Sequence, residues 1–121
     1  MPQPELIDVF RDTVVALVRR DGPDLSARQL GVFLTVYLDE TKGHTVRGLA
    51  ASLNVSKPAI TRALDRLGEF DLARRKADPM DRRSVLVQRT IKGAALLRDL
   101  RGIMTQAAKD AAPAARARKA A

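Results

Sequence analysis

Hydrophobic residues recur three or four positions apart in five stretches of the chain, which is the spacing of an amphipathic helix. Helices are therefore predicted over residues 5–20, 26–38, 46–53, 57–69 and 91–110. Ser26, Thr45, Ser56 and Thr90 precede the apolar runs of the last four helices and are suited to cap their first turns. Pro58 falls in the first turn of the fourth helix, where its missing N–H costs no hydrogen bond.

Between the fourth and fifth helices the hydrophobic period changes from helical to two. Residues 72–76 and 84–89 are predicted strands, and the turn-like segment 77–81 joins them as a β-hairpin. A polar turn is predicted over residues 39–43. The predicted fold is mainly α with a small β-hairpin wing, as a single domain over residues 1–110 that is followed by a flexible, basic, alanine-rich tail over residues 111–121.

The composition excludes several classes of chemistry. The 121 residues contain no cysteine, so a disulfide framework, a thiolate metal site and a cysteine nucleophile are all excluded. His44 is the single histidine, and it is interpreted as a loop or strand residue rather than a ligand or base. No metal and no cofactor is predicted. No apolar run approaches the roughly 20 residues of a membrane span, and the first residues lack a signal-peptide pattern. We therefore expect a soluble, cytoplasmic protein without membrane contact.

The charge is concentrated in the middle and at the end of the chain. Lys and Arg number 22 against 14 Asp and Glu, for a net charge of +8. Residues 46–92 hold eleven basic and five acidic residues, whereas residues 1–45 are slightly acidic. A positive field of this kind is typical of nucleic-acid binding. Aromatic residues are only 3% of the chain, which argues against single strands stacked on aromatic rings.

The order helix, turn, helix and basic hairpin is that of a winged helix-turn-helix. In this motif the second helix enters the major groove of duplex DNA, where base edges are distinguishable. On the helix over 57–69 the apolar stripe is Ile60, Leu64 and Leu67. The opposite face carries Pro58, Arg62 and Asp65, flanked by Thr61 and Arg66. The polar face therefore predicts contact with DNA, and an ordinary solvated helix face is the alternative.

Several segments carry a family resemblance. They are Leu49-Ala50, Leu53-Asn54-Val55-Ser56, Ile60-Thr61-Arg62, Leu64, Leu67, Arg75, Asp78-Pro79, Asp81-Arg82-Arg83 and Thr90-Ile91-Lys92-Gly93. Together they resemble the helix-turn-helix and wing of the MarR-type bacterial transcription regulators, over residues 26–104.

The resemblance implies a homodimer that binds pseudo-palindromic double-stranded DNA, with dimerisation helices over 5–20 and 91–110. Ser56, Lys57, Pro58, Thr61 and Arg62 match the recognition helix, and Arg66 extends that set. Arg83 matches an arginine at the wing tip that enters the minor groove, and Asp81 the acid that orients it. The remaining expected DNA contacts are Arg75 and Arg82 of the wing, with Thr45 and Arg89 as phosphate contacts.

Three features depart from the family pattern. Asp71 stands where a glycine is usual, so a left-handed backbone is predicted at an aspartate. Arg89 stands where a leucine is usual and is expected to extend outward from the apolar site. The segment after the wing is shorter than the two helices that the family usually has, and the sequence offers no support for a small-molecule effector.

The resulting hypothesis is a sequence-specific DNA-binding transcription regulator, a repressor acting as a homodimer. One alternative is a winged-helix adaptor or anti-repressor that contacts protein. Another is a nucleoid-type protein that binds DNA without sequence choice, mainly through the basic C-terminal region. An enzyme is not predicted, because no catalytic residues and no glycine-rich phosphate loop are recognisable.

Overall fold

The computed structural model describes residues 5–39 and 43–120, with side chains as far as residue 111. The elements in chain order are α1 (Leu6–Arg19), α2 (Ala27–Leu38), β1 (His44–Thr45), α3 (Val46–Leu53), α4 (Lys57–Glu69), β2 (Ala73–Asp78), β3 (Asp81–Arg89) and α5 (Ile91–Ala120). They form two compact units, which we call the winged lobe (Leu25–Leu97) and the terminal unit (Met1–Asp24 with Arg98–Ala121). The mainly helical, winged fold predicted from the sequence is confirmed.

The helices of the winged lobe begin at the predicted caps. The hydroxyls of Ser26, Thr45 and Ser56 each accept a hydrogen bond from a backbone N–H in the first turn that follows. At Ser26 the Gln29 side chain reciprocates, completing a capping box. These polar bonds define where α2, α3 and α4 begin, and therefore which residues of α4 lie at its exposed N-terminal end.

The core of the winged lobe lies among α2, α3 and α4. Its largest fully buried side chains are Phe33, Leu49, Ile60, Leu67, Val32 and Val36. Helix α4 buries one side of its surface against α2, α3 and β2, and its buried residues include the predicted stripe of Ile60, Leu64 and Leu67. Burial of this stripe leaves the opposite side of α4 to solvent.

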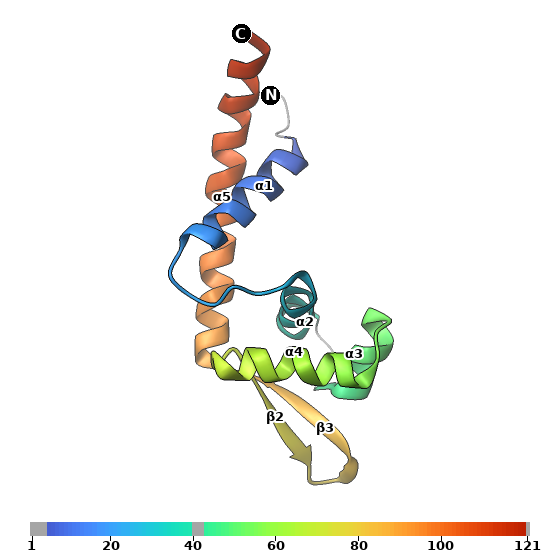
Figure 1. Cartoon of the computed structure of the whole chain (residues 1–121). Coiled ribbons are helices and arrows are strands. Elements are labelled where there is room, and N and C mark those ends of the chain that lie inside the picture. The colour runs from blue at the N-terminus through green and yellow to red at the C-terminus, as the bar shows by residue number, and fades with distance from the viewer. Residues whose placement is uncertain (1–4, 40–42, 121) are drawn as a thin grey trace. The chain divides into compact units, whose positions relative to one another are not determined.

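A three-stranded antiparallel sheet in the order β1-β3-β2 forms the wing. The hairpin strands β2 and β3 are labelled in Figure 1. The two-residue strand β1, with His44 opposite Val87, was not predicted as a sheet partner because it is too short to show a period of two. Strand β3 begins at Asp81 rather than at residue 84, so that Arg82 and Arg83 lie within the strand. A register irregularity at Ala77/Asp78 marks the end of the hairpin. The predicted turn over 39–43 includes residues 40–42, which lie outside the described residues.

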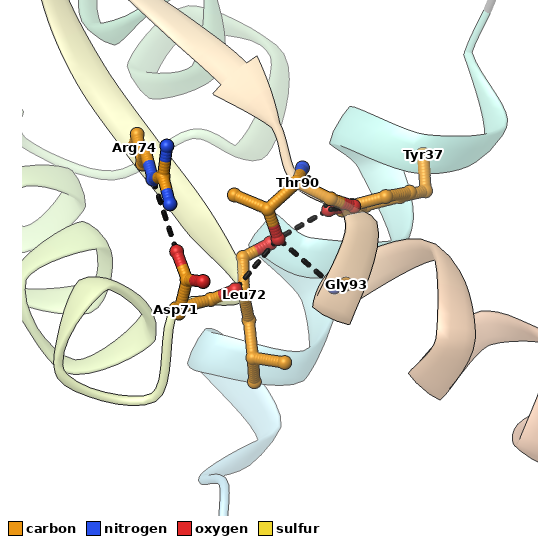
Figure 2. Close-up of polar contacts among 6 residues, drawn as sticks. All are labelled: Tyr37, Asp71, Leu72, Arg74, Thr90 and Gly93. Atoms are coloured by element: carbon orange, nitrogen blue, oxygen red, sulfur yellow. Dashed lines mark hydrogen bonds and ion pairs between the residues drawn. The ribbon is translucent and has the colours of Figure 1, made fainter.

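A hydrogen-bond network joins α2, the base of the wing and the start of α5 (Figure 2). The Tyr37 hydroxyl donates to the Leu72 carbonyl at 2.7 Å and accepts from the Thr90 N–H at 2.9 Å. The Thr90 hydroxyl donates to the Asp71 carbonyl at 2.6 Å and accepts from the Gly93 N–H at 2.9 Å. A Cβ at Gly93 would overlap the Tyr37 hydroxyl, so this close approach requires glycine.

Asp71 has the left-handed backbone that the sequence predicts. Its φ is 55°, and its carboxylate accepts a hydrogen bond from the Arg74 guanidinium at 3.0 Å. The aspartate therefore keeps the turn between α4 and β2 and pairs with a cation at the start of the wing.

The terminal unit consists of α1 and the part of α5 that follows Leu97. Val9, Ala107 and Ala111 form its small buried cluster, and the Arg20 guanidinium meets the Asp99 carboxylate at 3.2 Å. Helix α5 continues to Ala120, beyond the end predicted at residue 110. The alanine-rich sequence favours this continuation, since alanine has the highest intrinsic helix propensity.

Candidate DNA-binding interface

The N-terminal part of α4 presents a polar face to solvent. Ser56, Lys57, Pro58 and Arg62 are exposed, and Thr61 is half-buried. The Ser56 hydroxyl caps the helix by accepting from the Ala59 N–H at 3.2 Å. The unsatisfied N–H groups of a helix N-terminus favour nearby negative charge. The predicted recognition residues are thus brought together on one accessible end of the helix.

Arg66, at the other end of α4, is held by its own helix. Its guanidinium pairs with Glu69 at 2.9 Å and lies 4.7 Å from the centre of the Phe70 ring. Arg75 of β2 forms an ion pair with Asp65 of α4. Both arginines were predicted DNA contacts, and in the protein without DNA both have an acidic partner within the lobe; their role in binding stays a prediction.

The remaining predicted cations form no ion pair within the described residues. Lys57 and Arg62 on α4, and Arg82 and Arg83 on β3, are all exposed and have no acidic partner there. A guanidinium or ammonium group without an internal partner is available to a phosphate or a base edge. The ion pairs therefore divide the cations of the lobe into an internally satisfied group and an available group.

The wing orders its turn with two aspartates. The Asp78 carboxylate accepts from the Met80 backbone N–H at 2.9 Å, and the Asp81 carboxylate accepts from the Arg83 backbone N–H at 3.0 Å. We expected Asp81 to hold the guanidinium of Arg83, whereas its carboxylate holds the main chain of that residue. The acid therefore shapes the strand that carries Arg83 and leaves the guanidinium without an ion pair among the described residues.

Arg89 contacts α2. Its guanidinium donates to the Val36 carbonyl at 2.8 Å and to the Asp39 carbonyl at 3.2 Å, and lies 5.7 Å from the centre of the Tyr37 ring. Carbonyls at a helix C-terminus lack partners within the helix and favour a cation. The Arg89 guanidinium thus caps α2; its predicted phosphate contact stays a prediction.

A groove of about 390 Å³ lies between the starts of α3 and α4 and strand β3. Its lining residues are Thr45, Val46, Arg47, Lys57, Asp81, Arg83, Ser84 and Val85. Sequence reasoning missed Arg47, because only the second helix of the motif was searched for outward polar residues. The signal that would have identified Arg47 is its place directly after the apolar Val46, in the first turn of α3. Val46 is buried there and Arg47 is exposed.

Within the described residues, no group of three or more His, Cys, Asp or Glu side chains is arranged to hold a metal ion. None of the helices described has both the length and the apolar character that a membrane crossing needs.

Comparison with known proteins agrees with this geometry. The family model described as MarR family matches residues 32–85, which cover most of α2, the helix-turn-helix and the wing as far as Val85. The match is thus confined to the segment that forms the winged helix-turn-helix. No curated protein sequence matches the chain.

Solved structures of MarR-type regulators share the fold of the chain. A mutant of MarR from E. coli is 28% identical with a TM-score of 0.63, and the match covers 82% of this chain and 68% of that one. The transcriptional regulator Tm0710 from Thermotoga maritima is 20% identical with a TM-score of 0.69, covering 84% and 68%. A mutant of MepR from S. aureus, bound to oligodeoxyribonucleotide, is 19% identical with a TM-score of 0.69, covering 84% and 71%.

Proposed function

We propose that the protein is a sequence-specific transcriptional repressor that binds a pseudo-palindromic operator as a homodimer. The observation that carries this proposal is the division of the cations in the MarR-type lobe. Lys57, Arg62, Arg82 and Arg83 have no acidic partner among the described residues and belong to the recognition helix and the wing. Cations without internal partners on these two elements suit duplex DNA, in which the recognition helix would enter the major groove and the wing the minor groove.

The residues differ in the roles proposed for them. Thr61 and Arg62 lie beyond the first turn of α4 on its outward side, and we assign them to base edges in the major groove. Ser56, Lys57 and Pro58 lie at the helix start and are assigned to the phosphate backbone. Arg83 is assigned to the minor groove, where a narrow A·T-rich segment concentrates negative potential. Arg82 is assigned to a phosphate.

A homodimer is supported by the outer face of α1. Leu6, Ile7, Phe10, Val14 and Val18 are exposed there, although all five are large and apolar. Val9 and Thr13 of the same helix are buried. A second copy of the chain is the partner we propose for this face, because an apolar stripe of this kind is rare on the surface of a monomer. Two-fold symmetry would then place two recognition helices about 34–36 Å apart, or a multiple of it.

Repression requires fewer contacts of the protein than activation does. Occupancy of an operator is enough to exclude polymerase, whereas activation requires a further contact with it. Transcription from a promoter that contains the selected site, with and without the protein, measures this outcome directly.

The decisive experiment is selection of bound sites from random duplex DNA, followed by titrations at fixed salt. We expect a palindromic site. Arg62→Ala should weaken binding to it by roughly 1–3 kcal/mol and relax the base preference at one position of each half-site. Arg66→Ala is the matched control on the same helix and should leave the base preference unchanged, because Arg66 is held by Glu69.

Three outcomes contradict the proposal in different ways. Equal enrichment of all sequences would indicate binding without sequence choice. A single half-site bound by a monomer would contradict the dimer. Absence of salt-dependent binding to any duplex would favour a protein-interaction role for the lobe.

A further inference from the structure

Arg89 ends strand β3 and attaches the base of the wing to α2. Its guanidinium donates from Nε to the Val36 carbonyl at 2.8 Å and from Nη2 to the Asp39 carbonyl at 3.2 Å. It also lies 5.7 Å from the centre of the Tyr37 ring. All three contacts are with α2 or its C-terminal cap. A planar guanidinium that donates to two carbonyls and lies over a ring is restricted in its orientation, so the end of β3 is fixed to α2 by this side chain.

The main chain on both sides of the hairpin is fixed to the same helix. The Tyr37 hydroxyl donates to the Leu72 carbonyl, directly before β2, and accepts from the Thr90 N–H, directly after β3 (Figure 2). Ala73 and Arg89 are paired across the base of the hairpin. Helix α2 in turn packs against α4. It therefore joins the wing to the recognition helix, and Arg89 is the cationic part of that connection.

The wing is long compared with the precision that a DNA contact requires. Arg83 lies six residues along β3 from Arg89, about 20 Å at roughly 3.3 Å per residue, so a tilt of about 5° at the base would move Arg83 by roughly 2 Å. Hydrogen bonds from N–H groups to oxygen span only about 2.7–3.2 Å, so a displacement of this size removes the contact. Arg75 of β2 and Asp65 of α4 form a second, exposed attachment of the wing.

We propose that Arg89 is a positioning residue for DNA binding. It holds the wing at the angle to α4 at which Arg83 enters the minor groove while Arg62 reads the major groove. The inference rests on the proposed function and deepens it. A phosphate contact made by Arg89 itself is the competing account, and the two accounts differ in the expected effects of substitution.

The first test measures operator affinity at fixed salt for Arg89→Leu and Arg89→Lys. Leucine removes the hydrogen bonds to α2, and lysine keeps the charge but lacks the planar fork. We expect both variants to weaken binding roughly three- to tenfold, within the range of coupling that packed and hydrogen-bonded contacts transmit. Arg28→Leu, which removes an exposed arginine from the first turn of α2, should leave affinity unchanged. Full affinity in Arg89→Lys with a loss in Arg89→Leu would indicate a phosphate contact and overturn the proposal, since lysine binds phosphate as a point charge.

A double-mutant cycle locates the effect on the wing. If Arg89 acts through Arg83, Arg89→Leu should cause little further loss in a protein that already carries Arg83→Ala, because the contact that it positions is gone. In a protein that carries Arg62→Ala, the same substitution should cause its full loss. Equal losses in the two backgrounds would show that Arg89 does not act through the wing tip.

The third measurement uses the protein without DNA. Residual dipolar couplings of backbone amides report whether α4 and β3 keep one relative orientation. In the wild type we expect one alignment tensor to describe both elements. In Arg89→Leu the couplings at Arg82 and Arg83 should be reduced, while those of α4 and the far-ultraviolet circular dichroism stay unchanged. Unchanged couplings at the wing would show that its base does not need Arg89. If Arg89→Leu does not fold, Arg89→Lys is measured in its place.

The outcomes separate this inference from the proposed function. If the wild type binds its operator and both Arg89 variants bind equally well, the positioning role is wrong and the regulator proposal stands. If the losses do not depend on Arg83, the same conclusion holds. If the wild type binds no duplex, the regulator proposal fails and the inference fails with it.

Discussion

The winged lobe and the terminal unit differ in how completely they bury their apolar side chains. The lobe closes its own core: Phe33, Ile60 and Leu67 are each 0% exposed. The terminal unit has a buried cluster of one valine and two alanines, while Ile7 and Phe10 of α1 are 69% and 63% exposed. The lobe therefore has the interior of an independent domain, and the terminal unit has an apolar surface still to be covered.

The same contrast holds for polar groups. In the lobe the Tyr37 and Thr90 hydroxyls connect α2, the segments that enter and leave the wing at its base, and the first turn of α5 (Figure 2). In the terminal unit the exposed pair of Arg20, at the end of α1, and Asp99 of α5 is a kind of contact that contributes roughly 0–1 kcal/mol. The lobe therefore specifies its own geometry, whereas the terminal unit would gain its final stability in the proposed homodimer.

The largest expected effect is the loss of the Phe33 ring. Phe33→Ala should lower the free energy of unfolding by about 3–5 kcal/mol, because it removes a fully buried ring and leaves a cavity. Val9→Ala, the matched truncation in the terminal unit, should cost less than half as much. Urea denaturation followed by circular dichroism measures both. Equal losses would break the comparison, since they would mean that the two units have equally developed cores.

A methyl group at Gly93 tests the hydrogen-bonded junction of α2, the base of the wing and the start of α5. Gly93→Ala should destabilise the protein by about 3 kcal/mol, because the added Cβ would overlap the Tyr37 hydroxyl and crowd the Leu72 carbonyl. Gly31→Ala is the control in the same lobe, since a Cβ there meets no atom within 4 Å. A Gly93→Ala protein with an unchanged melting temperature would show that the junction yields easily.

A negative charge on the exposed apolar side of α1 tests whether this surface of the terminal unit is an interface. Phe10→Asp should raise the dissociation constant of the proposed homodimer roughly 10- to 100-fold, the equivalent of burying one large apolar side chain. Sedimentation over a concentration series measures this change. Arg19→Asp, an exposed position of the same helix away from the stripe, should have little effect. A dimer that tolerates Phe10→Asp would place the interface elsewhere.

The smallest expected effect has the opposite sign. Gly102→Ala on α5 should stabilise the protein by up to about 1 kcal/mol, because alanine favours the helix and the added Cβ meets no atom within 4 Å. Thermal melts at several protein concentrations would detect it. A loss of stability instead would indicate that a second copy packs closely against this position in the proposed homodimer.

Local chemistry in the sequence was enough to predict most elements. The caps at Ser26, Thr45 and Ser56 begin helices as predicted, because a cap depends on residues only three positions apart. Asp71 takes its left-handed turn for a similarly local reason. Strand β1 was not predicted, because two residues carry no periodic signal and their pairing with β3 is a long-range event.

The candidate site shows the same limit more sharply. Composition, charge and spacing alone predicted a basic winged helix-turn-helix and selected the outward face of α4. Which cations remain available was decided only in three dimensions: Arg66, Arg75 and Arg89 are held by Glu69, Asp65 and the end of α2. Arg47 became a candidate only when α3, α4 and β3 enclosed a groove. Periodicity depends on neighbours along the chain, whereas the partner of a long cationic side chain depends on which residues the fold brings within its reach.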